Sequence, residues 1–254
     1  MKLRYLSDLH LEFIKPHKID KFIKQIPIND CNEICILAGD IGNPYQSNYD
    51  IFMNFISKSF KKSFVIAGNH EYYNKTKTFD ETNIHLTNYF KQFNNISFLN
   101  NTYEYETINN TKYCFIGSTL WSKITNPYYK INDVYNIPNF DYIKYNELNQ
   151  KSIDFLNKTL NEPLNNCIMI THHMPSESLI DTKYNTSTML PYQQWFYSDL
   201  DELIEKNKDK IKCWIYGHTH TPYNGSIHGI TFLCNPIGYP NENHKINFQM
   251  NIII

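Results

Sequence analysis

The stretch that decides the fold is Ser63-Phe64-Val65-Ile66-Ala67, followed at once by Gly68-Asn69-His70-Glu71. Its first half is a short apolar run, which favours a buried strand. Its second half gathers an amide, an imidazole and a carboxylate at the point where that strand ends. Such a cluster is more specific than a single polar residue in a turn, and it indicates a ligand site at the end of the strand.

Polar segments follow apolar runs at four other places in the chain. They are Ser7-Asp8-Leu9-His10, Gly39-Asp40, Thr171-His172-His173 and Gly217-His218-Thr219-His220. Each one alone has an ordinary explanation, because Gly-Asp and Asp-x-His are common in turns where the side chain bonds the backbone. Together, the five segments supply enough oxygen and imidazole ligands to hold two divalent cations.

Apolar periodicity predicts an α/β core in which strands and helices alternate. In the first hundred residues we expect strands at Leu3–Leu6, Glu33–Ala38, Ser63–Ala67 and Phe98-Leu99, and helices at Ile19–Ile26, Tyr49–Phe60 and Phe79–Phe93. Later strands are expected at Tyr103–Ile108, Tyr113–Leu120, Asn166–Ile170, Cys213–Tyr216, Ile227–Leu233 and Ile246–Ile254. Later helices are expected at Tyr145–Leu160 and Trp195–Ile204, with a hairpin turn at Asn109-Asn110. All five polar segments then lie beyond the carboxyl ends of strands, where α/β folds bind ligands.

The five segments, in this order, resemble the pattern D-x-H, G-D, G-N-H-[ED], H and G-H-x-H of the calcineurin-like metallophosphoesterases. The match runs from Asp8 to His220. It implies a four-layer α/β/β/α sandwich with two mixed sheets and a hydrolase that attacks phosphate esters with a metal-activated water. Two divalent ions are implied as cofactors, with Mn, Fe, Zn and Ni as the candidates. Further stretches resemble small bacterial-type members: Asn69-His70-Glu71-Tyr72-Tyr73, Gly117-Ser118-Thr119-Leu120-Trp121 and Asn235-Pro236-Ile237-Gly238-Tyr239.

Carried over position by position, the resemblance implies a role for each motif residue. The first metal would be held by Asp8, His10 and His220, the second by Asn69, His172 and His218, and Asp40 would bridge the two. The catalytic residue would be His70, which would face the phosphoryl group or its leaving oxygen and either donate a proton to that oxygen or stabilise its charge. Substrate contacts are expected at Asn69, His70 and His173, and His173 is also the alternative to His172 as a ligand. Glu71 would begin a helix or orient a ligand.

One departure from the family bears on the substrate. Its Ser/Thr protein phosphatases place an Arg just before Gly-Asn-His and another shortly after Gly-Asp, and these clamp a dianionic phosphate. Here those positions read Ile66-Ala67 and Ile41-Gly42-Asn43, and Arg4 in the first strand is the only arginine of the chain. A phosphodiester carries one charge less, so we expect a phosphodiester or another small-molecule ester, such as a nucleotide.

Two alternatives stay open. A phosphomonoesterase acting on nucleotide or sugar phosphates could use a Lys as its anchor. A binding scaffold that has lost catalysis is the alternative from another class, although such a protein would be expected to lack His70 or a ligand, and none is missing. The rim segment 126–142 is rich in Tyr, including Tyr128, Tyr129 and Tyr135, which either stack on a nucleobase or simply pack the loop.

Composition sets the outer bounds. The 254 residues are 41% hydrophobic and 19% charged, which suits one globular domain over 1–254 built around one site. A net charge of −1 argues against long nucleic acid as a partner. No apolar run reaches the roughly 20 residues of a membrane span and no secretory signal is evident, so a cytoplasmic protein is expected. Six dispersed cysteines without a CxxC are expected to be structural thiols, and the oligomeric state is left open.

Overall fold

The strands of the protein form two sheets in a computed structural model that describes residues 2–28, 32–242, 247–248 and 251–253. The first sheet has the order β11-β1-β2-β3-β4. Its strands are β1 (Lys2–Leu6), β2 (Ile34–Ala38), β3 (Lys62–Ile66), β4 (Ile96–Phe98) and β11 (Asn251–Ile253). Strands β1 to β4 are parallel, and β11 pairs with β1 in the antiparallel sense.

The second sheet is also mixed and has the order β5-β6-β7-β8-β10-β9. Its strands are β5 (Thr102–Ile108), β6 (Thr111–Ser118), β7 (Cys167–Thr171), β8 (Ile211–Tyr216), β9 (Tyr223–Ile227) and β10 (Ile230–Cys234). The four inner strands are parallel, while β5 and β9 close the two edges in the antiparallel sense.

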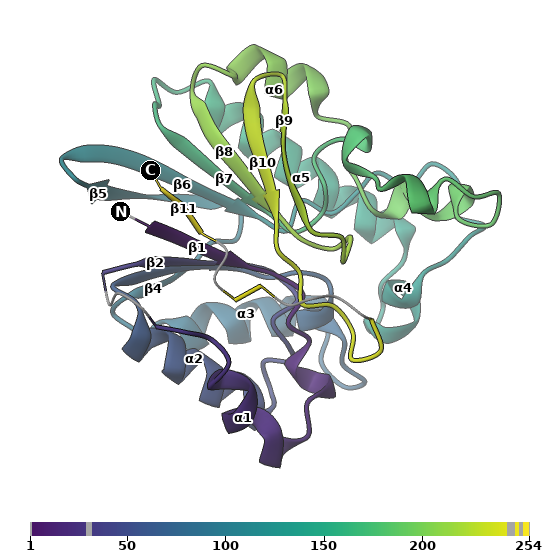
Figure 1. Ribbon diagram of the computed structural model, residues 1–254. Coiled ribbons are helices and arrows are strands. Elements are labelled where there is room, and N and C mark those ends of the chain that lie inside the picture. The colour runs from purple at the N-terminus through teal and green to yellow at the C-terminus, as the bar shows by residue number, and fades with distance from the viewer. Residues whose placement is uncertain (1, 29–31, 243–246, 249–250, 254) are drawn as a thin grey trace.

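Helices cover the outer face of each sheet, as Figure 1 shows. The first sheet carries α1 (Ile19–Ile23), α2 (Ser47–Ser59) and α3 (Phe79–Phe90), and the second carries α5 (Tyr142–Leu160) and α6 (Asp201–Asn207). The short α4 (Asn132–Asn136) lies at the end of the molecule where the loops gather (Figure 1). The expected four-layer α/β/β/α sandwich is therefore confirmed.

Strand alternation explains why the layers form. Along β1, Leu3 and Tyr5 point into the core between the sheets, whereas Leu6 belongs to the core under the helices. In the middle core the rings of Phe64 and Phe115, one from each sheet, stack with centroids 4.0 Å apart. Since the inner strands are buried on both faces, they read as continuous apolar runs.

Two sequence predictions are wrong in detail. The helix expected at Trp195–Ile204 begins only at Asp201, because the backbone before it pairs with the segment after β7. There the N–H of Ser198 donates to the carbonyl of Met174, and Leu200 N–H donates to the carbonyl of Pro175. The single strand expected at Ile227–Leu233 is instead a hairpin, since His228 and Gly229 both have positive φ, as a tight two-residue turn requires.

Other expectations are confirmed. The turn at Asn109-Asn110 has positive φ at both residues and joins β5 to β6. Five cysteines are free and buried, namely Cys35, Cys114, Cys167, Cys213 and Cys234, and Cys31 lies outside the described residues. Of the final run Ile246–Ile254, residues 251–253 form β11, and part of the rest falls outside the described residues. No helix within the described ranges is long and apolar enough to cross a bilayer.

The only arginine of the chain is built into the fold. Arg4 in β1 is fully buried and donates from Nε and Nη2 to Oε2 of Glu33, at 3.1 and 2.6 Å. Its Nη1 donates to the carbonyls of Pro27 and Phe248. A buried charge needs such a partner, since an unpaired one is costly.

We expect Glu33→Gln to lower the free energy of unfolding by about 3 kcal/mol, because it leaves the buried guanidinium of Arg4 uncompensated. Urea unfolding of the purified variant measures the change. The matched control is Glu205→Gln, which removes an exposed partner of Lys208 and should leave the urea midpoint unchanged. Equal midpoints for the two variants would contradict the role given to this pair.

Candidate metal centre

The five polar segments meet at one end of the sandwich, beyond the carboxyl ends of β1, β2, β3, β7 and β8. Three of these strands belong to the first sheet and two to the second. Backbone φ is positive, between 47° and 70°, at Asp8, His10, Asp40, His218 and His220. Residues other than Gly rarely adopt this backbone conformation, and those that do are concentrated at functional sites.

The first group of ligand atoms comes from Asp8, His10 and His220, whose nitrogen and oxygen atoms lie within 4.8 Å of one another. The Nε2 atoms of His10 and His220 are 3.0 Å apart, and Asp8 Oδ1 lies 3.5 Å from Nε2 of His220. Asp8 also accepts the backbone N–H of His218 at 2.9 Å, which ties the β1 loop to the β8 loop.

The second group joins Asp40, His172 and His218 within the same limit. Nε2 of His172 lies 3.3 Å from Oδ2 of Asp40 and 3.1 Å from Oδ1 of Asn69. Asp40 Oδ2 is also 3.9 Å from Nε2 of His10, so this carboxylate lies between the two groups. Nε2 of His218 is buried and has no hydrogen-bond partner within the described part of the chain.

Hydrogen bonds to the outer nitrogens fix where the imidazole lone pairs point. Nδ1 of His10 donates to Glu12, that of His220 to Glu242, and that of His172 to the carbonyl of Ala38. In each ring the neutral form then has its lone pair on Nε2, directed inward. The Nε2 atoms of His10 and His220 face each other, and Nε2 of His172 faces only the oxygens of Asp40 and Asn69. Both groups of ligand atoms therefore need a proton or a cation between them. The donor set of imidazole, carboxylate and amide fits divalent metals.

The pKa values of three histidines of the site are shifted by the charges and rings packed around them. Burial opposes a charge on His220, but the carboxylates of Asp8 and Glu242 outweigh it and raise the pKa to about 10. For His172, burial is likewise outweighed, chiefly by Asp40, and the pKa rises to about 9. Burial, with the imidazoles beside it, holds the pKa of His218 well below its usual range, so this ring is neutral and ready to bind a cation.

Glu71 locks the loops after β2 and β3 together. Its buried carboxylate accepts the backbone N–H groups of Gly68 at 2.6 Å, Ile41 at 2.7 Å and Asp40 at 3.1 Å. The loops approach so closely that a Cβ on Gly68 would lie 2.1 Å from Oδ1 of Asp40. Glycine at this position is therefore required by space.

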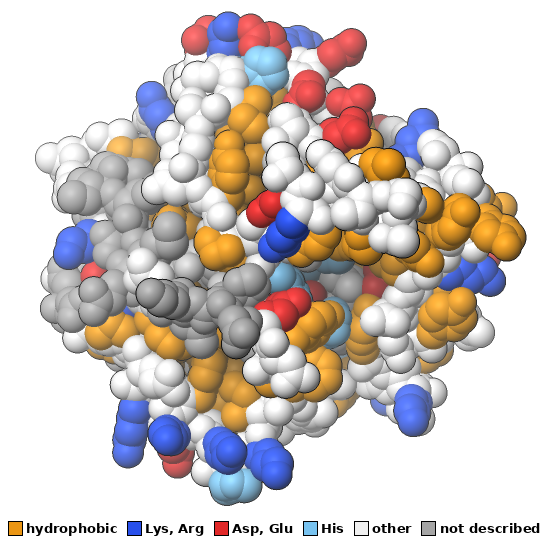
Figure 2. All heavy atoms as spheres, turned by 45° about the vertical axis from the view of Figure 1, so that its right-hand side comes forward, with side chains coloured by type: hydrophobic (Ala, Val, Ile, Leu, Met, Phe, Trp, Pro, Cys, Tyr) orange, Lys and Arg blue, Asp and Glu red, His pale blue; other side chains and the backbone are white. Residues whose placement is uncertain are grey.

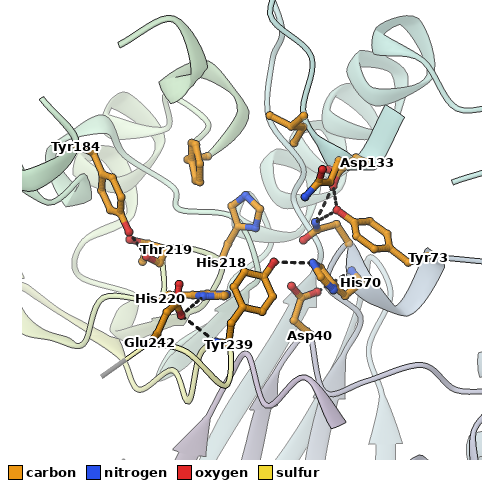
Figure 3. Close-up of a pocket in the computed structure, with 14 residues that line it drawn as sticks. Asp40, His70, Tyr73, Asp133, Tyr184, His218, Thr219, His220, Tyr239 and Glu242 are labelled. Carbon is orange, nitrogen blue, oxygen red and sulfur yellow. Dashed lines mark hydrogen bonds and ion pairs between the residues drawn. The ribbon is translucent and has the colours of Figure 1, made fainter. Parts of the chain in front are cut away.

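His70 faces the cleft that opens over these groups, and Asn69 lies at its wall. Oδ1 of Asn69 points to His172 because its Nδ2 donates to Asp133 at 2.8 Å. The backbone N–H of His70 donates to Asp40 at 2.8 Å, and its ring stacks on Tyr73 at 4.1 Å. Figure 3 shows His70 between Tyr239 and Tyr73.

His173 does not line the cleft. It is fully buried, Tyr145 hydroxyl is 2.7 Å from its Nε2, and Nδ1 faces the carbonyl of Thr119. Burial lowers its pKa to about 3. Its position supports neither the expected substrate contact nor the alternative that it replaces His172 as a ligand.

The cleft itself has a volume of about 240 Å³. Its lining residues are polar or aromatic except for one aliphatic side chain: Asp40, Asn69, His70, Tyr73, Ile131, Asn132, Asp133, Tyr184, Phe196, His218, Thr219, His220, Tyr239 and Glu242. Figure 2 shows the hollow with histidine and acidic side chains inside and hydrophobic ones around it. Among the described residues that line it, none is Lys or Arg.

From the sequence, five residues of this site receive no role: Glu12, Tyr73, Asp133, Tyr239 and Glu242. Tyr73 and Tyr239 nevertheless end two of the stretches that resemble small bacterial-type members, and this was the available signal. The sequence also leaves open that rim tyrosines stack on a base. Tyr128 and Tyr135 are 81% and 71% exposed and do not line the cleft. The ring of Tyr129 packs on Tyr192, and the backbone carbonyl of Tyr129 accepts the indole N–H of Trp195.

The comparisons with known proteins agree with this geometry. Residues 1–222 match the family described as calcineurin-like phosphoesterase. The chain belongs to this family. Its members are usually metal-dependent hydrolases. It is 35% identical to the uncharacterized protein L509 of Acanthamoeba polyphaga mimivirus, over 96% of this chain and 94% of that one.

Solved structures show the same fold at low identity. Phosphopantetheinyl hydrolase from Mycobacterium tuberculosis superposes with a TM-score of 0.74 at 14% identity, over 94% of this chain and 90% of that one. The protein TT1561 of Thermus thermophilus gives 0.55 at 11% identity, over 92% and 88%. These likenesses extend to nearly the whole sandwich, so the architecture is shared throughout.

Metal affinity should rise with pH. Without metal, His172 and His220 hold protons at neutral pH, and a cation must displace them, so each proton lost changes affinity about tenfold per pH unit below the pKa. Calorimetric titration of the metal-free protein with Zn²⁺ from about pH 6 to about pH 8, in buffers of different ionisation enthalpy, should show net proton release. Affinity that stays constant over this range would contradict the assignment.

Gly68→Ala should weaken metal binding by roughly tenfold or more, because the new Cβ displaces the Asp40 carboxylate. Mn²⁺ titration followed by calorimetry measures the loss, and circular dichroism establishes that the variant is folded. Unchanged affinity in a folded variant would show that the Asp40 carboxylate can move without consequence.

Proposed function

We propose that this protein is a dinuclear-metal phosphoesterase that favours phosphodiesters. The observation that carries the proposal is the convergence of buried lone pairs on two adjacent points with Asp40 between them. One ion would be held by Asp8, His10, Asp40 and His220, and the other by Asp40, Asn69, His172 and His218. Divalent ions bound there would supply a water of lowered pKa and neutralise charge on the phosphoryl oxygens.

The surrounding side chains prepare the site for this chemistry. Glu12, Glu242 and the Ala38 carbonyl hold three imidazoles in the tautomer whose Nε2 faces inward. Asn69 and His70 lie where an ester bound over these groups would pass. His70 is the proton source for the leaving oxygen, and protonation of that oxygen lowers the barrier to breaking the P–O bond. This route needs no covalent phosphoenzyme.

Charge in the cleft supports a diester over a monoester. The described residues lining it offer Asp40, Asp133 and Glu242 but no Lys or Arg. Arg4 is bound to Glu33 inside the sheet and cannot serve as a clamp. A dianionic monoester would therefore lack a fixed cationic anchor besides the metals, whereas a diester monoanion needs less compensation.

Hydrolysis of phosphomonoesters is the rival function, and Lys183 is the candidate anchor for it. Its Nζ donates to Oγ1 of Thr221 at 2.7 Å, next to the cleft residues Thr219 and His220. Reorientation of this exposed side chain could bring its charge to the rim. A scaffold without catalysis is the second rival, and it is disfavoured because all seven candidate ligands and His70 are present.

Hydrolysis of bis-p-nitrophenyl phosphate and p-nitrophenyl phosphate with Mn²⁺ tests the proposal. We expect kcat/KM for the diester to exceed that for the monoester by about tenfold or more, which corresponds to about 1.4 kcal/mol. Asp40→Asn should abolish hydrolysis of both esters because it removes the carboxylate that the two ions would share. EDTA should do the same because it removes the ions.

Glu205→Gln, far from the cleft, serves as the control and should retain full activity. If the wild type prefers the monoester, and Lys183→Ala lowers kcat/KM for the monoester, the rival phosphomonoesterase function would be favoured. Activity that survives both EDTA and Asp40→Asn would contradict a metal mechanism altogether.

A further inference from the structure

Both ring nitrogens of His70 are engaged in the structure. Nδ1 lies 2.9 Å from Oε1 of Glu12, and Nε2 lies 3.0 Å from the hydroxyl of Tyr239. A carboxylate only accepts, so Nδ1 donates to Glu12, and Nε2 is left to exchange a proton with Tyr239. The three residues form one chain of hydrogen bonds, and Figure 3 shows its link between Tyr239 and His70.

The Tyr239 hydroxyl covers the one ring nitrogen of His70 that Glu12 does not engage. His70 is only 6% exposed, and its ring is covered by Tyr73 on one side and by the edge of His10 on another. The Tyr239 side chain lines the cleft over the ligand groups and also a second cleft of about 480 Å³. This second cleft is formed by Glu12, Phe13, Asn43, His70, Tyr73, Asn132, Asn136 and Tyr239. A leaving group in the second cleft would keep its bridging oxygen beside the Tyr239 hydroxyl.

The backbone around Tyr239 is fixed to the ligand loops. The N–H groups of Ile237 and Gly238 donate to the carbonyls of Ser7 and Asp8, at 3.1 and 2.9 Å. Gly238 has a φ of +77°, which suits glycine, and the N–H of Tyr239 donates to Glu242 at 2.8 Å. The stretch Asn235–Tyr239, which no other part of the mechanism uses, thus holds one hydroxyl against His70.

Glu12 sets the direction of the hydrogen bonds that run from Glu12 through His70 to Tyr239. Its Oε1 accepts from both His70 and His10, at 2.9 and 3.1 Å, so one carboxylate places the Nδ1 proton of both rings. Glu12 touches neither the reacting atoms nor, in this geometry, the cleft over the ligand groups. It is a positioning residue.

We propose that Tyr239 is the catalytic residue that hands the proton to the leaving oxygen, with His70 behind it and Glu12 orienting His70. This assignment rests on the proposed phosphoesterase function. As the oxygen of a water bonds to phosphorus and gives one proton to solvent, the P–O bond to the leaving group breaks and the leaving oxygen takes the Tyr239 proton. The ring of His70 begins this step protonated on both nitrogens. The Tyr239 oxygen takes its Nε2 proton, and solvent returns a proton to His70 after the product departs.

The test compares two diesters that differ in their need for a proton, methyl p-nitrophenyl phosphate and methyl phenyl phosphate. Nitrophenolate is a stable anion, whereas phenolate gains much more from protonation. We expect Tyr239→Phe to lower kcat about 100-fold on the phenyl ester but less than about threefold on the nitrophenyl ester, with KM unchanged on both. Glu12→Gln should show the same bias at a smaller size, because a misoriented His70 still carries a proton.

Tyr45→Phe is the matched control, since its hydroxyl bonds Thr82 outside both clefts, and both rates should equal those of the wild type. An equal loss on the two esters in Tyr239→Phe would overturn the assignment and leave Tyr239 a role in shaping the cleft. Full activity of Tyr239→Phe with a phenyl-selective loss in His70→Asn would show that His70 donates directly. Wild-type inactivity on both esters, despite bound Mn²⁺, would contradict the proposed function itself and this assignment with it.

Discussion

Buried lone pairs that point at one another can coexist only when positive charge lies between them, and this constraint organises the whole loop end of the protein. Nε2 of His10 faces Nε2 of His220, and Nε2 of His172 faces the oxygens of Asp40 and Asn69. Carboxylates and a carbonyl behind the rings keep them from turning away. The local structure is therefore built around charge that the chain alone does not supply.

The sandwich makes this convergence feasible because its two sheets end at the same edge. Loops from β1, β2 and β3 meet loops from β7 and β8, and each brings only one or two side chains. The backbone accepts left-handed conformations at five of these residues, and Glu71 ties two loops by their N–H groups. Rigid strands with a double-sided apolar core provide the support that such strained loops need.

Much of this arrangement is readable in the sequence, because polar residues directly after an apolar run mark strand ends, and the motif order places them on one edge. The hairpin at His228-Gly229 escaped detection because apolar residues continue on both sides of it. At Trp195–Ile204 the sequence has helical spacing, but long-range backbone pairing overrides it before Asp201. Supporting residues were harder to predict, since Tyr239 meets His70 across 169 positions and no local pattern announces such a contact. Residues that hold others in place depend on the tertiary fold, whereas metal ligands carry their chemistry in their own side chain.

The cleft without lysine or arginine among its described lining residues also bears on turnover. Fixed cations that attract an anionic substrate hold the anionic product equally well and slow its departure. Among the described residues that line the cleft, no lysine or arginine adds a fixed positive charge to that of the ions, and Asp133 and Glu242 border the site. Product should leave readily, and dissolved salt should change the encounter rate little, because long-range electrostatic attraction by the protein is weak.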